Sequence, residues 1–331
     1  MAILITGGAG FIGAATAEKL IRRGDEVVLV DNLNSYYSVA LKQARLDHLR
    51  GLGGSMRFIE VDFSDHEQLN QALADMAIER IVHLGAQPGV RYSIEHPFAY
   101  AASNLTGHLS LLELARARQV GHMVYASSSS VYGNSAKVPF SVEDRSDHPI
   151  SLYAATKRAD ELMSETYAHL YRIPLTGLRF FTVYGPWGRP DMMAWKCTDK
   201  VLKGEPVPVF NKGEMFRDFT YIDDIVSGIL ATLDAPPQDN GKAKAGGSIS
   251  PHALYNIGNN KPEHLMRLIE TIEQACGKKA IIDFQPMQPG DVERTYADID
   301  AIARDVGYSP TTPIEVGVPA FVDWYRGFTG L

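Results

Sequence analysis

The chain has 331 residues, 45% of them hydrophobic, which is enough to bury a large core and to build one large unit with a smaller second part. Its net charge of −7 argues against nucleic acid or an anionic membrane surface as a partner. No apolar run is long enough for a membrane span, strand-like sequence from residue 3 leaves no room for a signal peptide, and Cys197 and Cys276 fit neither a disulfide framework nor a metal site. We therefore expect a cytoplasmic protein with two buried thiols and no bound metal.

The N-terminal segment has the pattern of a dinucleotide-binding unit. Ala2–Thr6 is an apolar run of strand length, and a helical pattern follows that reaches Arg23. Between them lies Gly7-Gly8-Ala9-Gly10-Phe11-Ile12-Gly13. Glycine at positions 7, 10 and 13 allows a tight turn, a close approach to a pyrophosphate and close packing of the new helix on the sheet. Gly7, Gly10 and Gly13 are therefore predicted to bind a dinucleotide.

An acidic residue ends the second predicted strand. Residues 26–30 are strand-like, and Asp31 follows them directly. A carboxylate at this position accepts hydrogen bonds from the ribose diol and repels a 2′-phosphate. The sequence therefore predicts NAD rather than NADP as the cofactor.

Three more strands are expected before residue 130, with a helix at residues 104–117 before the last of them. The strands are expected at residues 56–61, 80–84 and 122–127. Asp62 follows the first of these strands and either reaches the adenine side of the cofactor or caps the loop before Asp65, two readings that the sequence leaves open. His83 lies within a buried strand and is expected to be a core residue.

Hydroxyl, phenol and ammonium groups follow the fifth predicted strand. That strand runs into Ser127-Ser128-Ser129-Ser130, and Tyr153 and Lys157 then stand four residues apart on a predicted helix. Four-residue spacing places a phenol and an ammonium on one helix face, where the cation stabilises the phenolate and makes it a base for a sugar hydroxyl. Alone, the serines would indicate a turn and the pair a solvated helix face. After a dinucleotide motif, their order indicates alcohol chemistry.

The second half of the chain is predicted to bind the substrate. We expect a polar loop at residues 235–251. The other elements are expected as helices at 198–202 and 263–276, strands at 207–210 and 254–258, and a turn at 211–213. The predicted fold is α/β: a Rossmann-type doubly wound parallel sheet with a smaller C-terminal α/β substrate-binding domain. Residues 1–178 form the first domain and residues 179–331 the second, with residues 219–258 returning to the first.

Several stretches together resemble the UDP-glucuronate 4-epimerases, a family of extended short-chain dehydrogenases/reductases. The resemblance runs from GGAGFIG to PGDVERTYAD, and it includes DNLNSYY at residues 31–37, LKQARL after it, and RFFTVYGPWGRPDM at residues 179–192. Thr182 stands where related UDP-galactose epimerases usually carry asparagine. The chain departs from the family at Gly85 and Pro88, where alanines are common, and at Cys197, where an aromatic residue is common.

The resemblance implies roles for individual residues. Ser128, Tyr153 and Lys157 match the catalytic hydroxyl, the base and its helper. The implied cofactor residues are Gly7, Gly10, Phe11, Ile12, Gly13, Asp31, Asn32, Asp62 and Lys157. The implied substrate residues are Ser129, Ser130, Thr182, Arg189, Arg217 and Arg294.

Two of these arginines have an alternative assignment. Arg217 suits the nucleotide diphosphate because its fork donates two hydrogen bonds, but it could instead pair with Asp218 or Asp223; Arg294 is the second candidate. Arg189 could hold a sugar carboxylate, or it could form an ion pair at the surface or at a dimer contact.

The implied activity is NAD-dependent 4-epimerisation of UDP-glucuronate to UDP-galacturonate through a transient 4-keto sugar. The resemblance also implies a homodimer that pairs the helix at 104–117 with the helix carrying Tyr153. A 4,6-dehydratase or a decarboxylase would need an acid beside the strand-five hydroxyl, where this chain has Ser129 and Ser130. The remaining alternatives are a UDP-glucose/UDP-galactose 4-epimerase and a non-catalytic protein that senses dinucleotide.

Overall fold

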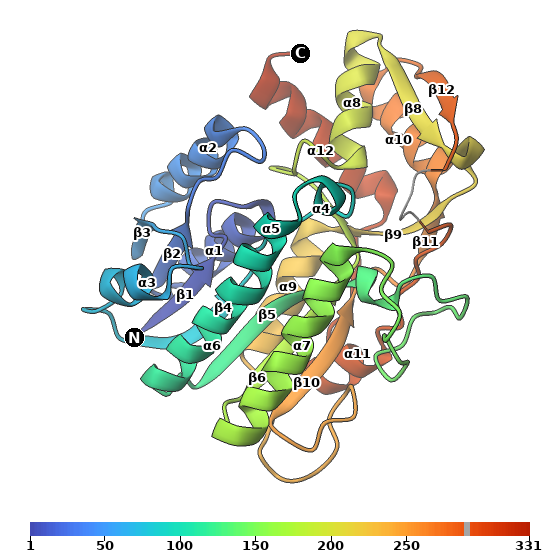
Figure 1. Cartoon of the computed structure of the whole chain (residues 1–331). Coiled ribbons are helices and arrows are strands. Elements are labelled where there is room, and N and C mark those ends of the chain that lie inside the picture. The colour runs from blue at the N-terminus through green and yellow to red at the C-terminus, as the bar shows by residue number, and fades with distance from the viewer. Residues whose placement is uncertain (288–291) are drawn as a thin grey trace.

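The computed structural model describes residues 1–287 and 292–331, and a seven-stranded parallel sheet forms its centre (Figure 1). The strands lie in the order β10-β6-β5-β4-β1-β2-β3, and each pairs with its neighbours in parallel. Their bounds are β1 Ala2–Thr6, β2 Val27–Asp31, β3 Met56–Glu60, β4 Ile78–His83, β5 His122–Ser128, β6 Leu175–Phe180 and β10 His252–Ile257.

Alternating side chains along each central strand pack on the two faces of the sheet. In β1, Ile3 and Ile5 belong to one buried cluster, whereas Ala2 and Leu4 belong to the other. Successive side chains of a strand point to opposite faces, so a continuous apolar run indicates a sheet that is covered on both sides. This explains why the central strands read as apolar throughout.

Helices cover both faces of the sheet. The helices α3, α6 and α7 lie on the face toward the viewer in Figure 1, and α1, α9 and α11 pack on the other, with α2 beside α1. Their bounds are α1 Phe11–Arg23, α2 Val39–Gly51, α3 His66–Ala72, α6 Gly107–Arg118, α7 Leu152–Tyr171, α9 Ile222–Leu233 and α11 Asp300–Val306. The short helices α4 Tyr92–Glu95 and α5 Pro97–Tyr100 precede a π-helical turn at Ala101–Thr106.

A second core lies beyond the carboxyl ends of the central strands, at the upper right of Figure 1. It packs three helices against one another and against two small sheets, β11-β9-β7 and β12-β8. These elements are β7 Thr182–Tyr184, α8 Met193–Lys203, β8 Pro206–Phe210, β9 Phe216–Tyr221, β11 Pro262–His264, α10 Leu265–Cys276, β12 Ile281–Gln285 and α12 Ile314–Thr329. Cys197 and Cys276 are both free and buried in this core.

The predicted α/β fold with a Rossmann-type sheet is confirmed, because the strand order 3-2-1-4-5-6 is that of dinucleotide-binding sheets. The predicted boundary at 178–179 falls inside β6, and α9 and β10 from the second half join the large sheet and its covering helices. No helix in the described residues is long and apolar enough to cross a membrane.

Some predicted elements differ from the structure. The helix expected from residue 263 begins at Leu265, because Pro262–His264 pairs antiparallel with β9 as β11. The helix expected at 198–202 begins earlier, at Met193. No side chain caps its start, so the sequence carries no signal for the first residue of the helix. The helix expected from residue 104 begins at Gly107, and residues 101–106 before it form the π-helical turn, in which Asn104 makes tertiary contacts described below.

Candidate active site

The glycine-rich turn brings the N-terminus of α1 to the carboxyl end of β1. Gly7 has φ +66°, and a Cβ at Gly13 would lie 2.1 Å from the carbonyl oxygen of Gly7, so neither position accepts a larger residue without displacement. No side chain caps the start of α1, whose first two residues are Phe11 and Ile12. The first amides of a helix lack partners within the helix and attract anions. This arrangement fits the pyrophosphate of a dinucleotide.

Asp31 lies at the end of β2 beside this turn. Its carboxylate accepts hydrogen bonds from the backbone N–H of Ala9 (3.2 Å) and of Leu33 (2.9 Å). Asn32 donates to Asp62 at 2.9 Å, so the predicted cofactor residues from β2 and β3 lie together. Burial raises the pKa of Asp62, but hydrogen bonds from Ser64 and Asn32 outweigh burial and hold the pKa below its usual value. Asp62 therefore caps its loop and also meets Asn32.

Lys42 is a buried cation near this acid, and no local pattern in the sequence indicates that it belongs to the cofactor site. Its Nζ donates to the carbonyl of Asn34 (2.8 Å) and stands 3.9 Å from Asp31. Burial lowers the pKa of Lys42, and Asp31 opposes that shift. A cation so close to the carboxylate that is predicted to bind the ribose would contribute to the charge balance of the predicted cofactor site.

The serine run forms a turn against the helix that carries the predicted base. Ser128 ends β5, and its Oγ accepts from the N–H of Ser130 at 3.2 Å, which begins the 3₁₀ turn Ser129–Tyr132. This turn packs against α7, where Tyr153 and Lys157 lie near the start of the helix. The Ser151 hydroxyl caps α7 by accepting from the N–H of Ala154 (3.1 Å). Strand end and helix start therefore bring the three predicted catalytic residues to one region.

Lys157 is almost fully buried. Its Nζ donates to the carbonyl oxygen of Ala126 and to Asp160, both at 3.0 Å. Burial raises the pKa of Asp160 to about 6, although the neighbouring ammonium opposes the shift. The hydrogen bond to Ala126 fixes the position of the Lys157 ammonium relative to β5. Asp160 supplies a counter-charge that no pattern in the sequence indicates.

One aromatic side chain, Tyr100, lies against the predicted base. Tyr100 meets the Tyr153 ring edge-on, with centroids 6.1 Å apart, and its hydroxyl donates to the carbonyls of Pro88 and Gly89. Asn104 lies in the π-helical turn and holds the same loop: it accepts from the N–H of Gln87 at 2.8 Å and donates to Thr156 at 3.0 Å. These contacts tie the loop after β4 to α7.

Arg189 lies close to this group. Its Nε and Nη2 donate to Asp191 at 2.9 and 2.7 Å, and the Tyr36 hydroxyl contacts the same carboxylate at 3.4 Å. Burial lowers the pKa of Arg189, but Asp191 outweighs it and the pKa is raised, with Tyr36 and Tyr153 adding smaller contributions. The arginine is thus within electrostatic reach of the predicted base while it forms an ion pair with its neighbour.

Arg217 and Arg294 lie on either side of Phe216. The Arg217 Nη1 donates to the carbonyls of Phe216 (2.9 Å) and Glu293 (3.1 Å). The Arg294 guanidinium stacks on the Phe216 ring at 4.5 Å. Asp218 binds the backbone N–H groups at 259, 260 and 297, and Asp223 pairs with Lys19.

Ser129 and Ser130 line a pocket whose lining also includes Val292 and Thr295. These two residues flank residues 293–294 in the sequence, so the pocket lies close to the predicted substrate residue Arg294. Thr182 begins β7, in register with Phe219 of β9, the strand that carries Arg217. Of the segment PGDVERTYAD, the first three residues lie outside the described residues. Ser129 and Ser130 therefore lie near residues 292–295, and Thr182 lies on one of the small sheets of the second core.

The departure at Gly85 has a packing reason. A Cβ at Gly85 would lie 2.5 Å from the Phe63 ring, and a Cβ at Gly107 would lie 2.3 Å from the other edge of the same ring. Phe63 thus fills the space between two glycines, where the alanine common in the family would clash.

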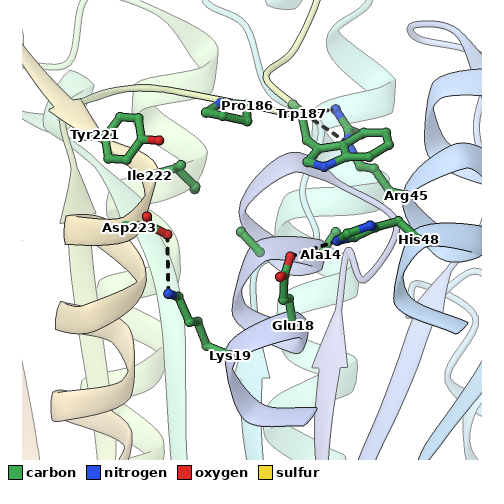
Figure 2. A pocket seen from close by; sticks show the side chains of 11 residues that line it. Ala14, Glu18, Lys19, Arg45, His48, Pro186, Trp187, Tyr221, Ile222 and Asp223 are labelled. Carbon is green, nitrogen blue, oxygen red and sulfur yellow. Dashed lines mark hydrogen bonds and ion pairs between the residues drawn. The ribbon is translucent and has the colours of Figure 1, made fainter. Parts of the chain in front are cut away.

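Another pocket, of about 220 Å³, lies between α1, α2 and the start of α9 (Figure 2). Its lining includes Glu18 paired with His48 and Lys19 paired with Asp223, and the Trp187 side chain covers one end. None of the predicted site residues lines it. The pocket therefore belongs to the back of the cofactor unit.

Comparisons with known proteins identify the family of the chain. The family model described as GDP-mannose 4,6 dehydratase matches residues 4–321. A probable UDP-glucuronate 4-epimerase from Rhizobium meliloti is 45% identical over 331 residues, 98% of this chain and 97% of that protein. The crystal structure of UDP-glucuronic acid 4-epimerase from Bacillus cereus, in complex with UDP-glucuronic acid and NAD, matches with a TM-score of 0.87 and 32% identity, over 99% of this chain and 100% of that one. UDP-glucose 4-epimerase from Thermotoga maritima, with UDP-glucose, matches with a TM-score of 0.87 and 30% identity over 99% of both chains.

Proposed function

Because the chain belongs to the GDP-mannose 4,6-dehydratase family of short-chain dehydrogenase/reductase-type enzymes, we propose that it is a UDP-sugar 4-epimerase that uses NAD and acts on UDP-glucuronate. One observation carries the choice of substrate. A cation, Arg189, lies within electrostatic reach of the predicted base Tyr153, where a sugar carboxylate would need a partner.

Tyr153 is the proposed base for the 4-hydroxyl. As a phenolate it would take the hydroxyl proton, and Ser128 would share that proton from the end of β5. Lys157, fixed by the carbonyl of Ala126, would favour the phenolate through its charge. Bound NAD⁺ would accept the C4 hydride and return it to the opposite face of the sugar. The uncapped start of α1 and the carboxylate of Asp31 support the binding of this cofactor.

Holding the carboxylate is the special demand of this substrate. The 4-keto form of a glucuronate is a β-keto acid, which loses CO₂ when the carboxylate stands perpendicular to the carbonyl plane. Arg189 would keep the carboxylate near that plane, with Ser129, Ser130 and Thr182 as further polar partners. Its bonds to Asp191 use Nε and Nη2, so the Nη1 side of the fork remains for a substrate oxygen.

The nucleotide would bind between the serine turn and the second core. Arg217 and Arg294 are proposed to meet the diphosphate, because both lie beside Phe216 next to the pocket lined by Ser129 and Ser130. A sugar held only by its diphosphate could then turn over between the two hydride transfers while the cofactor stays in place.

Assembly as a homodimer is also proposed. Leu162 on α7 is 54% exposed, and Phe98 on α5, a helix that contacts α7, is 86% exposed. Exposed large apolar side chains on adjacent helices fit an interface between two copies of the chain.

Light scattering should give twice the chain mass of 36.4 kDa, and Leu162→Glu should give one chain mass. The control is Ile249→Glu, in a loop with similar exposure. A single-chain mass for the parent at micromolar concentration would contradict the dimer.

A cytoplasmic location with no nucleic-acid partner completes the proposal. Two free, buried cysteines support a reducing compartment, and the net charge of −7 opposes binding to nucleic acid.

The activity is tested by incubating the purified protein separately with UDP-glucuronate, UDP-glucose and UDP-xylose. We expect UDP-galacturonate from the first at a higher kcat/KM than any product from the others. A preference for UDP-glucose would refute the assigned substrate, and no conversion of any UDP-sugar would refute the enzyme itself.

A further inference from the structure

Arg45 in α2 is a buried cation whose hydrogen bonds all go to neutral acceptors. It is 1% exposed. Nε donates to the carbonyl of Trp187, Nη2 donates to the carbonyls of Trp187 and Gly188, and Nη1 donates to the carbonyl of Ala9 and to the Tyr37 hydroxyl. A guanidinium has five N–H groups, and these five bonds, 2.6 to 3.1 Å long, can use all of them. Burial lowers the pKa of Arg45, so this geometry must compensate for desolvation.

The carbonyl acceptors of Arg45 belong to two loops that are proposed to meet different ligands. Ala9 lies in the glycine-rich turn, and its N–H donates to Asp31 while its carbonyl accepts from Arg45. Both backbone polar groups of Ala9 are therefore hydrogen-bonded to side chains. Trp187 and Gly188 directly precede Arg189, the proposed partner of the substrate carboxylate.

The loop before Arg189 has a strained conformation at the point where Arg45 binds it. Trp187 has φ +64°, a left-handed conformation that residues other than glycine rarely adopt. The Trp187 carbonyl accepts two of the guanidinium N–H groups, and Figure 2 shows the Arg45 side chain next to this residue. The direction in which the chain leaves Gly188, and hence the position of Arg189, depends on that conformation.

We propose that Arg45 is a positioning residue that couples the dinucleotide turn to the Trp187–Gly188 segment and thereby sets Arg189 for a substrate carboxylate. The proposal rests on the proposed function for the role of Arg189, but its geometric part does not. A lysine at position 45 would keep the charge, yet its three N–H donors on one nitrogen cannot span acceptors in both loops. Arg45→Lys is therefore the informative variant.

The first experiment measures amide hydrogen exchange in NAD-loaded protein without any sugar nucleotide. The N–H of Gly188 bonds to Gly185, and the N–H of Met192 bonds to Arg189, so the loop has amides that report its order. Arg45→Lys should raise exchange of these amides about tenfold, the scale expected for losing one charge-assisted hydrogen bond. The control is Arg50→Lys on the exposed side of the same helix, where the side chain pairs with Asp47. Unchanged exchange in Arg45→Lys would overturn the proposal.

The second experiment is a double-mutant cycle on ligand binding, made in a Tyr153→Phe background so that no turnover occurs. Calorimetry should show that Arg45→Lys weakens UDP-glucuronate about five- to tenfold and barely changes UDP-glucose. In the presence of Arg189→Ala, the effect of Arg45→Lys on UDP-glucuronate should vanish. An effect of equal size on both sugars, or one that persists without Arg189, would mean that Arg45 only supports the fold and would overturn the proposal.

A third measurement covers the case in which Arg45→Lys is poorly folded. Arg45→Ala opens space beside the pocket of Figure 2, which Arg45 itself lines. Methylguanidinium at millimolar concentration should restore slow exchange of the loop amides and UDP-glucuronate binding, and methylammonium should not. Equal rescue by both cations would overturn the geometric part. If the parent protein binds no UDP-glucuronate, the proposed function fails, while the exchange experiment still decides whether Arg45 positions the loop.

Discussion

Replacing Arg189 with alanine removes the cation within electrostatic reach of Tyr153 and leaves Asp191 without its ion-pair partner. In the parent, Arg189 forms two short bonds to Asp191, and these hold the pKa of that carboxyl below its usual value although burial raises it. The change therefore does two things. It removes a donor for the substrate carboxylate, and it leaves an uncompensated negative charge nearby.

The expected loss follows from the number of bonds that remain for substrate. One charge-assisted hydrogen bond contributes roughly 1.5–3 kcal/mol, which corresponds to about 10- to 150-fold in affinity for UDP-glucuronate. UDP-glucose has no carboxylate, so its affinity should change by less than about twofold. The freed carboxylate of the 4-keto sugar should also rotate, and the variant should release CO₂ and accumulate NADH.

Asp191→Asn separates the two effects. If Arg189 binds the carboxylate directly, Arg189→Ala with Asp191→Asn stays weak for UDP-glucuronate, and Asp191→Asn alone binds at least as well as the parent. If the loss comes only from the exposed charge of Asp191, the double variant recovers. Arg304→Ala, which removes a similar Arg–Asp pair at the surface, is the matched control. Affinity would be measured by calorimetry, and CO₂ and NADH by a coupled assay and absorbance. Unchanged affinity without any rise in CO₂ or NADH would refute the role of Arg189.

Three further predictions follow from the site. Tyr153→Phe should keep the fold and lose about 10²–10⁴ in turnover, as removal of a general base does; turnover near that of the parent would exclude Tyr153 as the base. Asp31→Ala should weaken NAD much more than NADP in a binding assay, and equal preference in the parent would remove its assigned role. Because burial raises the pKa of Asp160 from 3.8 to about 6, protonation stabilises the folded state. Its contribution is complete below pH 3.8 and lost as the pH rises through about 6, so Asp160→Asn should gain stability relative to the parent over this window in pH-dependent denaturant titrations. A flat difference would contradict this.

The cofactor half could be predicted from the sequence because its signals are local. A glycine-rich turn follows an apolar strand, and Asp31 ends the next strand, so neither feature requires knowledge of distant residues. The pairing of Tyr153 with Lys157 on one helix face is predictable for the same reason, since it depends on helical spacing alone.

Other features depend on contacts between distant segments. Asn104 looks like an ordinary helical residue, and the π-helical turn around it accompanies bonds to Gln87 and Thr156 that no local pattern encodes. Lys42 and Arg45 were read only as family-like sequence, because a cation on a helix is usually solvated, and only the fold shows that both are buried. The spacing in the LKQARL stretch, which puts Lys42 and Arg45 three positions apart on one helix face, is the one signal that could have placed them together.

Return of the C4 hydride to the sugar is the central claim, and isotope labelling tests it most directly. The NAD-loaded protein would be incubated with UDP-glucuronate deuterated at C4, and the product would be analysed by mass spectrometry and NMR. We predict UDP-galacturonate that retains the deuterium at C4, with no net NADH and no CO₂. A product that has lost the label, or a decarboxylated sugar with NADH left on the enzyme, would contradict the account.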